Sequence, residues 1–307
     1  GQIGGSLALA LRPLVSRVVG IDRDPAVIDH ARRHAWIEAG AVDGWPLLAE
    51  ADAVVVAVPV ADIPEVLARA APYLRPGCLV SDTGSVKAPV VSRAAEVLPP
   101  DVWFTGGHPM AGTERSGPLA ADPGLFRGRT YVLTPAPPWP EAACREWAAL
   151  LEAAGARVRV MDAEEHDRHV ALASHLPLLL AVGLARAAAA ASPGLPRLPE
   201  LVAGGFRDTT RVAGGEPTVG ADILAANWAH IEDLLPAFRD EIERLARAAR
   251  RGDREELRRL LAEARAFRTE LLAAAPAAGP TGDGRGAAAP QPAPREHPSH
   301  GKEHEVL

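Results

Sequence analysis

Two short loops in the first half of the chain combine a histidine, a hydroxyl and several glycines. The segment VSDTGSVK at residues 80–87 contains Ser85, and GGHPMAGTERSG at residues 106–117 contains His108. Histidine is a suitable general base near neutral pH, because its ordinary pKa lies close to that pH. A histidine followed by proline in a glycine-rich loop could also merely cap a turn. These residue types by themselves therefore leave both a base and a capping role open for His108.

The chain opens with a glycine pattern typical of phosphate binding. Gly1, Gln2, Ile3 and Gly4 match the second half of G-x-G-x-x-G and lead into an apolar segment at residues 7–11. The first of these glycines would let the backbone approach a pyrophosphate, and the second would let the helix pack close to its strand. The N–H groups at the start of such a helix attract phosphate. The pattern therefore predicts a dinucleotide site.

An acidic residue ends the next predicted strand. Asp22 follows Gly4 by 18 positions (22 − 4), close to the distance at which an acid binds the ribose hydroxyls of adenosine. An acid here favours NAD as the cofactor because it would repel a 2′-phosphate, while Arg23 leaves NADP possible. The first strand and first glycine of the motif would precede residue 1. We therefore expect a dinucleotide-binding domain that is truncated at its start.

Strands and helices are expected to alternate through residues 1–162. Apolar, strand-like runs lie at residues 17–22, 53–58, 78–82, 102–106, 130–134 and 157–161, and helix-like runs lie at 64–71, 88–98 and 141–154. This alternation predicts an α/β fold with a Rossmann-type doubly wound parallel sheet, whose first strand is missing at the N-terminus. Because ligands of such sheets bind beyond the carboxyl ends of the strands, both loops should open onto the cofactor cleft.

After residue 162 only helices are expected. Helix-like segments lie at residues 163–191, 199–212, 221–250 and 253–274, and Pro and Gly dominate from about residue 276. The expected organisation is a dinucleotide-binding domain at 1–162, an all-α domain for substrate binding and dimerisation at 163–275, and a disordered tail at 276–307. The tail is too poor in large apolar residues to offset the entropy lost on ordering.

Composition excludes several classes of partner. A formal net charge of −6 leaves no basic surface for nucleic acid. The apolar run at 176–185 stops at Arg186 and is shorter than the roughly 20 residues that span a bilayer, so no membrane partner is expected. Cys78 and Cys144 make no disulfide framework, which favours a cytoplasmic protein.

A metal site is not expected either. His166 and His169 lie at i and i+3, but no carboxylate or thiolate cluster accompanies them in the sequence.

Four motifs, in this order and spacing, resemble the prephenate dehydrogenase family. They are D-x-G-S-V-K, G-x-H-P-M-A-G-T-E, S-H-L-P and G-F-R-D-T-T-R-V-A, and the similarity runs from Gly1 to about residue 270. The resemblance implies NAD-dependent oxidative decarboxylation of prephenate to 4-hydroxyphenylpyruvate, a step of tyrosine biosynthesis. It also implies a homodimer built through the helical domain.

The resemblance further implies roles for individual residues. His108 would accept the proton of the C4 hydroxyl of prephenate while hydride leaves C4 for the nicotinamide, and Ser85 would bind the same hydroxyl and orient His108. Arg211 would hold a substrate carboxylate through two parallel hydrogen bonds. The other implied members of the substrate pocket are His175, Glu114 and Asp208, the last as a partner of Arg211.

Structural roles remain open for several of these residues. Ser85 and Lys87 could cap the helix that starts near residue 88, His175 could be a hydrogen-bonded core histidine, and Arg211 could cap a helix end. The chain also departs from the family pattern. Leu178 stands where the family usually has a second histidine after S-H-L-P, and Val219-Gly220 stands where it usually has Met-Trp.

Alternative functions also remain open. Arogenate could replace prephenate as the substrate. A dehydrogenase of the β-hydroxyacid type usually needs a catalytic lysine from its helical domain, and the chain has no lysine between Lys87 and Lys302. A non-catalytic NAD-binding protein would take up NAD without reducing it.

Overall fold

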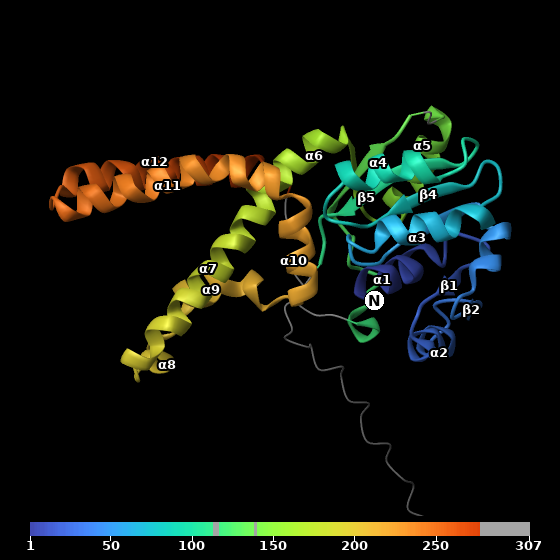
Figure 1. Cartoon of the computed structure of the whole chain (residues 1–307), viewed down its shortest axis with the longest axis horizontal. Helices are drawn as coiled ribbons and strands as arrows, with labels where there is room; N and C mark the ends of the chain where they lie inside the picture. The colour runs from blue at the N-terminus through green and yellow to red at the C-terminus, as the bar shows by residue number, and fades with distance from the viewer. Residues whose placement is uncertain (113–116, 138–139, 277–307) are drawn as a thin grey trace, which may run out of the picture.

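The computed structural model describes residues 1–112, 117–137 and 140–276 (Figure 1). An α/β domain comes first along the chain, and the rest of the described residues are helical. Both parts have the order expected from the sequence. The predicted tail lies outside the described residues except for residue 276, and Glu114 also lies outside them.

The main sheet has five strands in chain order. They are β3 (Ala53–Val56), β4 (Leu79–Asp82), β5 (Trp103–Pro109), β6 (Thr130–Pro135) and β7 (Arg157–Val160). A separate parallel pair is formed by β1 (Val19–Ile21) and β2 (Ala39–Ala41). The sequence interpretation missed β2, because the three residues Ala-Gly-Ala carry no strand signal. Within the described residues no further strand pairs with β1 or β3, and a missing first strand stays a prediction.

The sheet is mostly parallel, with one exception. Strand β6 runs antiparallel to β5 and parallel to β7. A parallel connection needs a crossover, usually a helix. In the described part of the β5–β6 connection the helical element is the short 3₁₀ turn η3 (Pro118–Ala120). The expectation of a wholly parallel sheet was therefore wrong at this one pairing.

Helices cover both faces of the sheet, as a doubly wound fold requires. The helices of this domain are α1 (Gln2–Leu11), α2 (Pro25–Arg33), α3 (Ile63–Ala70), α4 (Ala88–Val97) and α5 (Glu141–Ala153), with 3₁₀ turns η1 (Trp45–Glu50) and η2 (Ala71–Tyr73). One core joins α1 and α5 to Leu79, and the other joins α3 and α4 to Val80. Adjacent strand residues point to opposite faces, so Leu79 and Val80 belong to different cores.

The helical part begins directly after β7. Its elements are α6 (Ala163–Val170), the π-helical turn η4 (Ala171–His175), α7 (Leu176–Ala191), the turn η5 (Ser192–Gly194), α8 (Leu198–Leu201), α9 (Gly204–Thr210), the turn η6 (Arg211–Gly214), α10 (Pro217–Ala226), α11 (Trp228–Arg250) and α12 (Arg254–Ala274). The single helices predicted at 199–212 and 221–250 are each divided. The second division falls at Asn227, whose buried side chain bonds to other elements.

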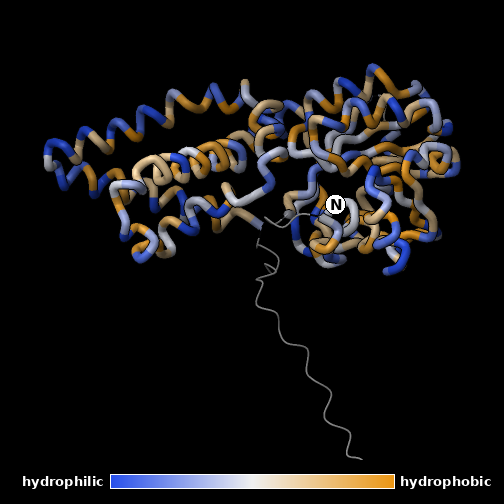
Figure 2. The backbone as a smooth tube through the Cα atoms, turned by 60° about the horizontal axis from the view of Figure 1, so that its bottom comes forward, coloured by the Kyte–Doolittle hydropathy of each residue, from blue (hydrophilic) through white to orange (hydrophobic). Residues whose placement is uncertain are grey.

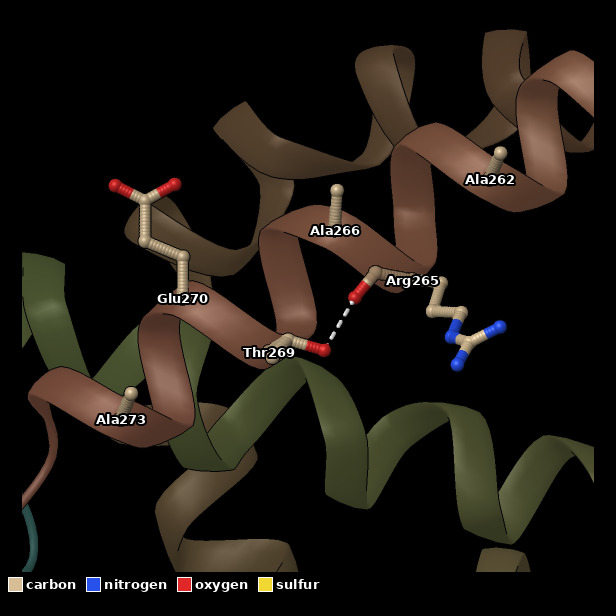
Figure 3. A pocket seen from close by; sticks show the side chains of 6 residues that line it. All are labelled: Ala262, Arg265, Ala266, Thr269, Glu270 and Ala273. Carbon is tan, nitrogen blue, oxygen red and sulfur yellow. Dashed lines mark hydrogen bonds between the residues drawn. The ribbon is translucent and has the colours of Figure 1, made fainter.

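The helical part projects away from the α/β domain. Figure 1 shows α7 and the antiparallel hairpin of α11 and α12 extending to one side. Hydrophobic and hydrophilic residues alternate along the α11–α12 hairpin (Figure 2), whereas α7 consists almost entirely of apolar residues. A shallow, open pocket runs along α12 (Figure 3); there Thr269 Oγ1 donates to the Arg265 carbonyl at 2.9 Å. The pocket is lined by Ala262, Arg265, Ala266, Thr269, Glu270 and Ala273.

The helix expected at residues 163–191 corresponds to one continuous helical stretch. The segment Ala163–Gly194 has 32 residues and contains the apolar run at 176–185, so by length and composition it could cross a membrane. This is weak evidence for a membrane span, because long core helices of other proteins meet the same criterion. The segment also carries buried polar side chains, among them His166 and Asp167.

Candidate active site

The glycine pattern at the start of the chain leads directly into α1. Gly1 is the N-cap of α1. A Cβ added at Gly4 would lie 3.0 Å from the Cβ of Ala57, which follows β3. Gly4 therefore allows the close helix–strand packing that the last glycine of the motif provides.

The acidic residue expected at the ribose site directly follows β1. Asp22 is half-buried, and its Oδ1 accepts a hydrogen bond from the backbone N–H of Asp24 at 3.0 Å. This local turn fixes the carboxylate at the carboxyl end of the strand, the edge at which ligands of doubly wound sheets bind.

A fully buried ion pair lies at the same edge of the main sheet. Lys87 Nζ pairs with the carboxylate of Asp82 and also donates to the Gly107 carbonyl at 2.8 Å. Asp82 accepts hydrogen bonds from the backbone N–H of Gly107 at 3.0 Å and of Gly84 at 2.7 Å. A Cβ at Gly107 would lie 2.4 Å from the Asp82 carbonyl oxygen, so only glycine fits there. The pair therefore fixes the backbone immediately before His108.

His108 lies near the carboxyl end of β5 with 8% of its surface exposed. Its Nδ1 is 2.8 Å from Nε2 of His166 on α6. Burial lowers the pKa of His108 well below its ordinary value, and electrostatic interactions with His166, Lys87 and His175 lower it further. His108 is therefore neutral at pH 7, the state that a general base requires.

His166 connects His108 to a carboxylate. His166 Nδ1 lies 2.7 Å from Oδ1 of Asp167, and both side chains are 1% exposed. The same carboxylate accepts hydrogen bonds from the backbone N–H of Lys87 at 2.7 Å and of Ala88 at 2.8 Å, the N-cap and the first residue of α4. Asp167 thus caps α4 and ties it to α6.

His175 lies at the junction of η4 and α7, and it is also 1% exposed. Its Nδ1 is 2.9 Å from Nδ2 of Asn227, which also donates to the Asp167 carbonyl at 2.9 Å. The Nε2 atom of His175 is buried without a hydrogen-bond partner among the described residues. Burial lowers the pKa of His175 to about 4, against an opposing effect of Asp167.

The structure brings only some of the predicted site residues together. His108 and His175 interact electrostatically in one buried cluster. Ser85 lies half-buried in the β4–α4 loop. Arg211 begins η6 and Asp208 lies in α9, and both are exposed on segments that pack near α7. Their assignment to the pocket stays a prediction, as does that of Glu114.

Sequence reasoning missed the role of several buried polar residues. Asp82, Asp167 and Asn227 were not singled out, and His166 was considered only as a metal ligand. Among the described residues no group of three His, Cys, Asp or Glu could hold a metal ion, and His169 points to the Glu165 carbonyl instead. The adjacent pair His166-Asp167, near the start of a long and largely apolar helical segment, was a sequence signal that could have indicated buried polar side chains.

Comparison with known families matches both parts of the chain. Residues 7–160 match the family described as "Prephenate dehydrogenase, nucleotide-binding domain", and residues 162–263 match "Prephenate dehydrogenase, dimerization domain". These matches agree with the α/β domain and the helical part seen in the structure.

Individual relatives give the same result. The prephenate dehydrogenase of Bacillus subtilis is 34% identical over 88% of this chain and 74% of its own length. The cyclohexadienyl dehydrogenase of Zymomonas mobilis is 34% identical over 82% of this chain and 88% of its own.

A solved structure is also similar. The prephenate dehydrogenase of Aquifex aeolicus, in complex with hydroxyphenyl propionate and NAD+, superposes with a TM-score of 0.80. It is 29% identical in sequence, and the match covers 88% of this chain and 94% of that one. With its nucleotide-binding and dimerization domains both matched, the chain belongs to the prephenate dehydrogenase family, whose members are oxidoreductases.

Proposed function

We propose that the protein catalyses the NAD-dependent oxidative decarboxylation of prephenate to 4-hydroxyphenylpyruvate, a cytoplasmic step of tyrosine biosynthesis. The observation that carries this proposal is His108, a buried and neutral histidine at the carboxyl edge of the sheet, where the helical part meets the nucleotide-binding domain. A base in this position can take a proton from a substrate hydroxyl next to the cofactor.

The residues at the start of α1 fit a dinucleotide. Gly1, Gln2 and Ile3 at the N-terminus of α1 would bind the pyrophosphate, and Gly4 gives the tight packing described above. Asp22 would bind the adenosine ribose hydroxyls and favour NAD over NADP. When bound, the nicotinamide accepts the hydride from C4 of the substrate. Asp22→Ala should therefore weaken discrimination against NADP, measured as the ratio of kcat/KM for the two cofactors.

The side chains around His108 would orient the substrate. Ser85 would bind the C4 hydroxyl, and His175 would donate from Nε2. The Asn227 amide must present its NH₂ group to the Asp167 carbonyl, so the same group also donates to Nδ1 of His175. Nε2 of neutral His175 therefore carries the hydrogen and needs an acceptor. An oxygen of the substrate would satisfy it.

The substrate side chain is bound at the helical domain in this proposal. Arg211 would hold a carboxylate with Asp208 as its partner, and Glu114 would complete the pocket. Arogenate is the second candidate, because similar proteins include an arogenate dehydrogenase of Synechocystis with a TM-score of 0.76 and 29% identity. Prephenate and arogenate share the reacting ring and differ in the keto or amino group of the side chain.

Side-by-side turnover tests this function. Purified protein is incubated with NAD and either prephenate or arogenate, and NADH formation is followed by its absorbance. We expect NADH with prephenate at the higher kcat/KM. A higher kcat/KM with arogenate would reassign the substrate, and NAD binding without NADH formation from either compound would refute the enzymatic proposal.

We also propose that the protein is a homodimer formed by its helical domain, residues 163–275. Large apolar side chains of α12 are exposed in the single chain, among them Phe267 at 65% and Leu271 at 55%. A second copy would cover them, as the description of the matched domain suggests. Light scattering should give the mass of two chains, and Phe267→Glu should shift the mass toward one.

A further inference from the structure

We propose that His166 is a positioning residue: with Asp167, it holds His108 in the tautomer whose Nε2 lacks a proton, so that Nε2 is the base. The inference rests on the proposed function for its kinetic consequence. Its structural content, the position of one proton on each of two rings, can be measured without turnover.

The assignment starts from Asp167, whose carboxylate can only accept hydrogen bonds while it is ionised. It already accepts two from the backbone of α4, at 2.7 Å from Lys87 N and 2.8 Å from Ala88 N. Its Oδ1 is also 2.7 Å from Nδ1 of His166. That nitrogen must therefore carry a hydrogen.

The proton positions of both rings follow from this contact. A neutral imidazole has one N–H, so Nε2 of His166 is an acceptor. It lies 2.8 Å from Nδ1 of His108, which must be the donor in this pair. Nε2 of His108 is then left with its lone pair. A doubly protonated His166 would reverse the second bond and place the proton of His108 on Nε2, where it would block the base.

The surroundings of His108 favour this neutral arrangement. His108, His166 and Asp167 are each at least nine-tenths buried. The titratable groups that lower the pKa of His108 electrostatically are His166 from α6, His175 from η4 and Lys87 at the β4–α4 edge. Asp167 is bonded to His166, and Asp82 is paired with Lys87. The ammonium group of Lys87 opposes a further positive charge on His108.

The same chain stabilises the charge that forms during the reaction. The C4 hydroxyl proton moves to Nε2 of His108, the O–H electron pair forms the carbon–oxygen double bond, and hydride leaves C4 for oxidised nicotinamide. His108 thereby becomes a cation whose Nδ1–H is still bound by His166. Beyond His166, the Asp167 carboxylate accepts the next hydrogen bond of the chain. An imidazole held in this way needs no rotation before it accepts the proton.

Substitution of His166 by Leu and by Gln provides the kinetic test. Leu removes the acceptor for Nδ1 of His108, whereas the amide of Gln reaches about as far as Nε2 of histidine and can still accept. Because general base catalysis is worth roughly 10²–10⁴-fold, we expect His166→Leu to lower kcat by about 10²-fold. His166→Gln should recover most of that loss, and KM for the substrate should change by less than about threefold in both.

His169→Gln is the matched control, because His169 lies on the same helix but is exposed and bonds only to the Glu165 carbonyl. It should retain the wild-type kcat. If His166→Leu also retains the wild-type kcat, or if Gln gives no recovery over Leu, the positioning role is wrong.

Nitrogen NMR of the histidine rings tests the tautomers directly, at neutral pH and without substrate. We expect His108 and His166 both to be protonated at Nδ1 and bare at Nε2. In Asp167→Asn the amide can donate to Nδ1 of His166 and reverse the chain, so the proton of His108 should move to Nε2. A wild-type His108 protonated at Nε2 would overturn the proposal. Because NMR needs no turnover, absent activity refutes the proposed function without deciding this inference.

Discussion

Replacement of His175 by Asn should make the protein less sensitive to acid. His175 is buried, and its ring accepts a hydrogen bond from Asn227 through Nδ1. Asn at this position keeps an acceptor near Nδ1 but cannot be protonated in the relevant pH range. The variant loses some packing at every pH, so the informative quantity is the change of unfolding free energy with pH and not its absolute value.

The size and the sign of this change in unfolding free energy follow from the lowered pKa of His175. The pKa falls from the ordinary 6.5 to about 4 on folding, so between these values the unfolded chain binds more protons than the folded protein. Stability is therefore lost as the pH falls through this window. At about 1.4 kcal/mol per pH unit, the full effect is about 3 kcal/mol near pH 4, and about 2 kcal/mol of it is reached by about pH 5.

Urea unfolding at about pH 7.5 and about pH 5 measures this difference. Between the two conditions the wild-type protein should lose about 2 kcal/mol more stability than His175→Asn. All carboxylates are common to both proteins, so their contributions cancel in the comparison. His169→Asn serves as the control, since its exposed side chain should leave the wild-type pH dependence unchanged. Equal pH dependence in His175→Asn and wild type would show that His175 is not held neutral by burial.

Substitutions at three further positions test the site. His108→Asn should lower kcat by roughly 10²–10⁴-fold with a much smaller change in KM, because the base acts in the transition state; near-normal kcat across neutral pH would remove His108 as the base. Arg211→Ala should raise KM for prephenate by roughly 10- to 150-fold at unchanged NAD affinity, since a charged hydrogen bond is worth about 1.5–3 kcal/mol. Arg211→Lys should recover part of the lost affinity for prephenate. Lower thermal stability of Arg211→Ala with unaltered KM would indicate that Arg211 caps a helix instead. Lys87→Met should cost about 3–5 kcal/mol in urea unfolding because it leaves the buried Asp82 carboxylate without its cation, and a loss below about 1 kcal/mol would contradict a charged pair.

Local sequence patterns were sufficient to predict the type and order of most strands and helices. Five of the six expected strand segments correspond to strands of the main sheet and the sixth to β1, since each is a short apolar run bounded by turn residues. The change from alternating elements to helices after residue 162 was also visible in the sequence. The strand β2 and the breaks at Asn227 and near residues 202–203 were not, because these features depend on contacts with other elements.

Motif identity placed His108, Ser85 and the glycines of α1 at one edge of the sheet, because the loops that follow parallel strands meet there. The direction of β6 required the tertiary structure, since a strand carries no local signal of the direction in which it pairs.

The sequence by itself determined the family and the order of the two domains, and it singled out His108 as the candidate base. Only the tertiary structure decided which groups hold the His108 ring. Asp167 accepts hydrogen bonds from Lys87, 80 positions away in the sequence, and from Asn227, 60 positions away. A polar side chain can be recognised as buried only when its surroundings are known, and burial makes each of its hydrogen bonds obligatory.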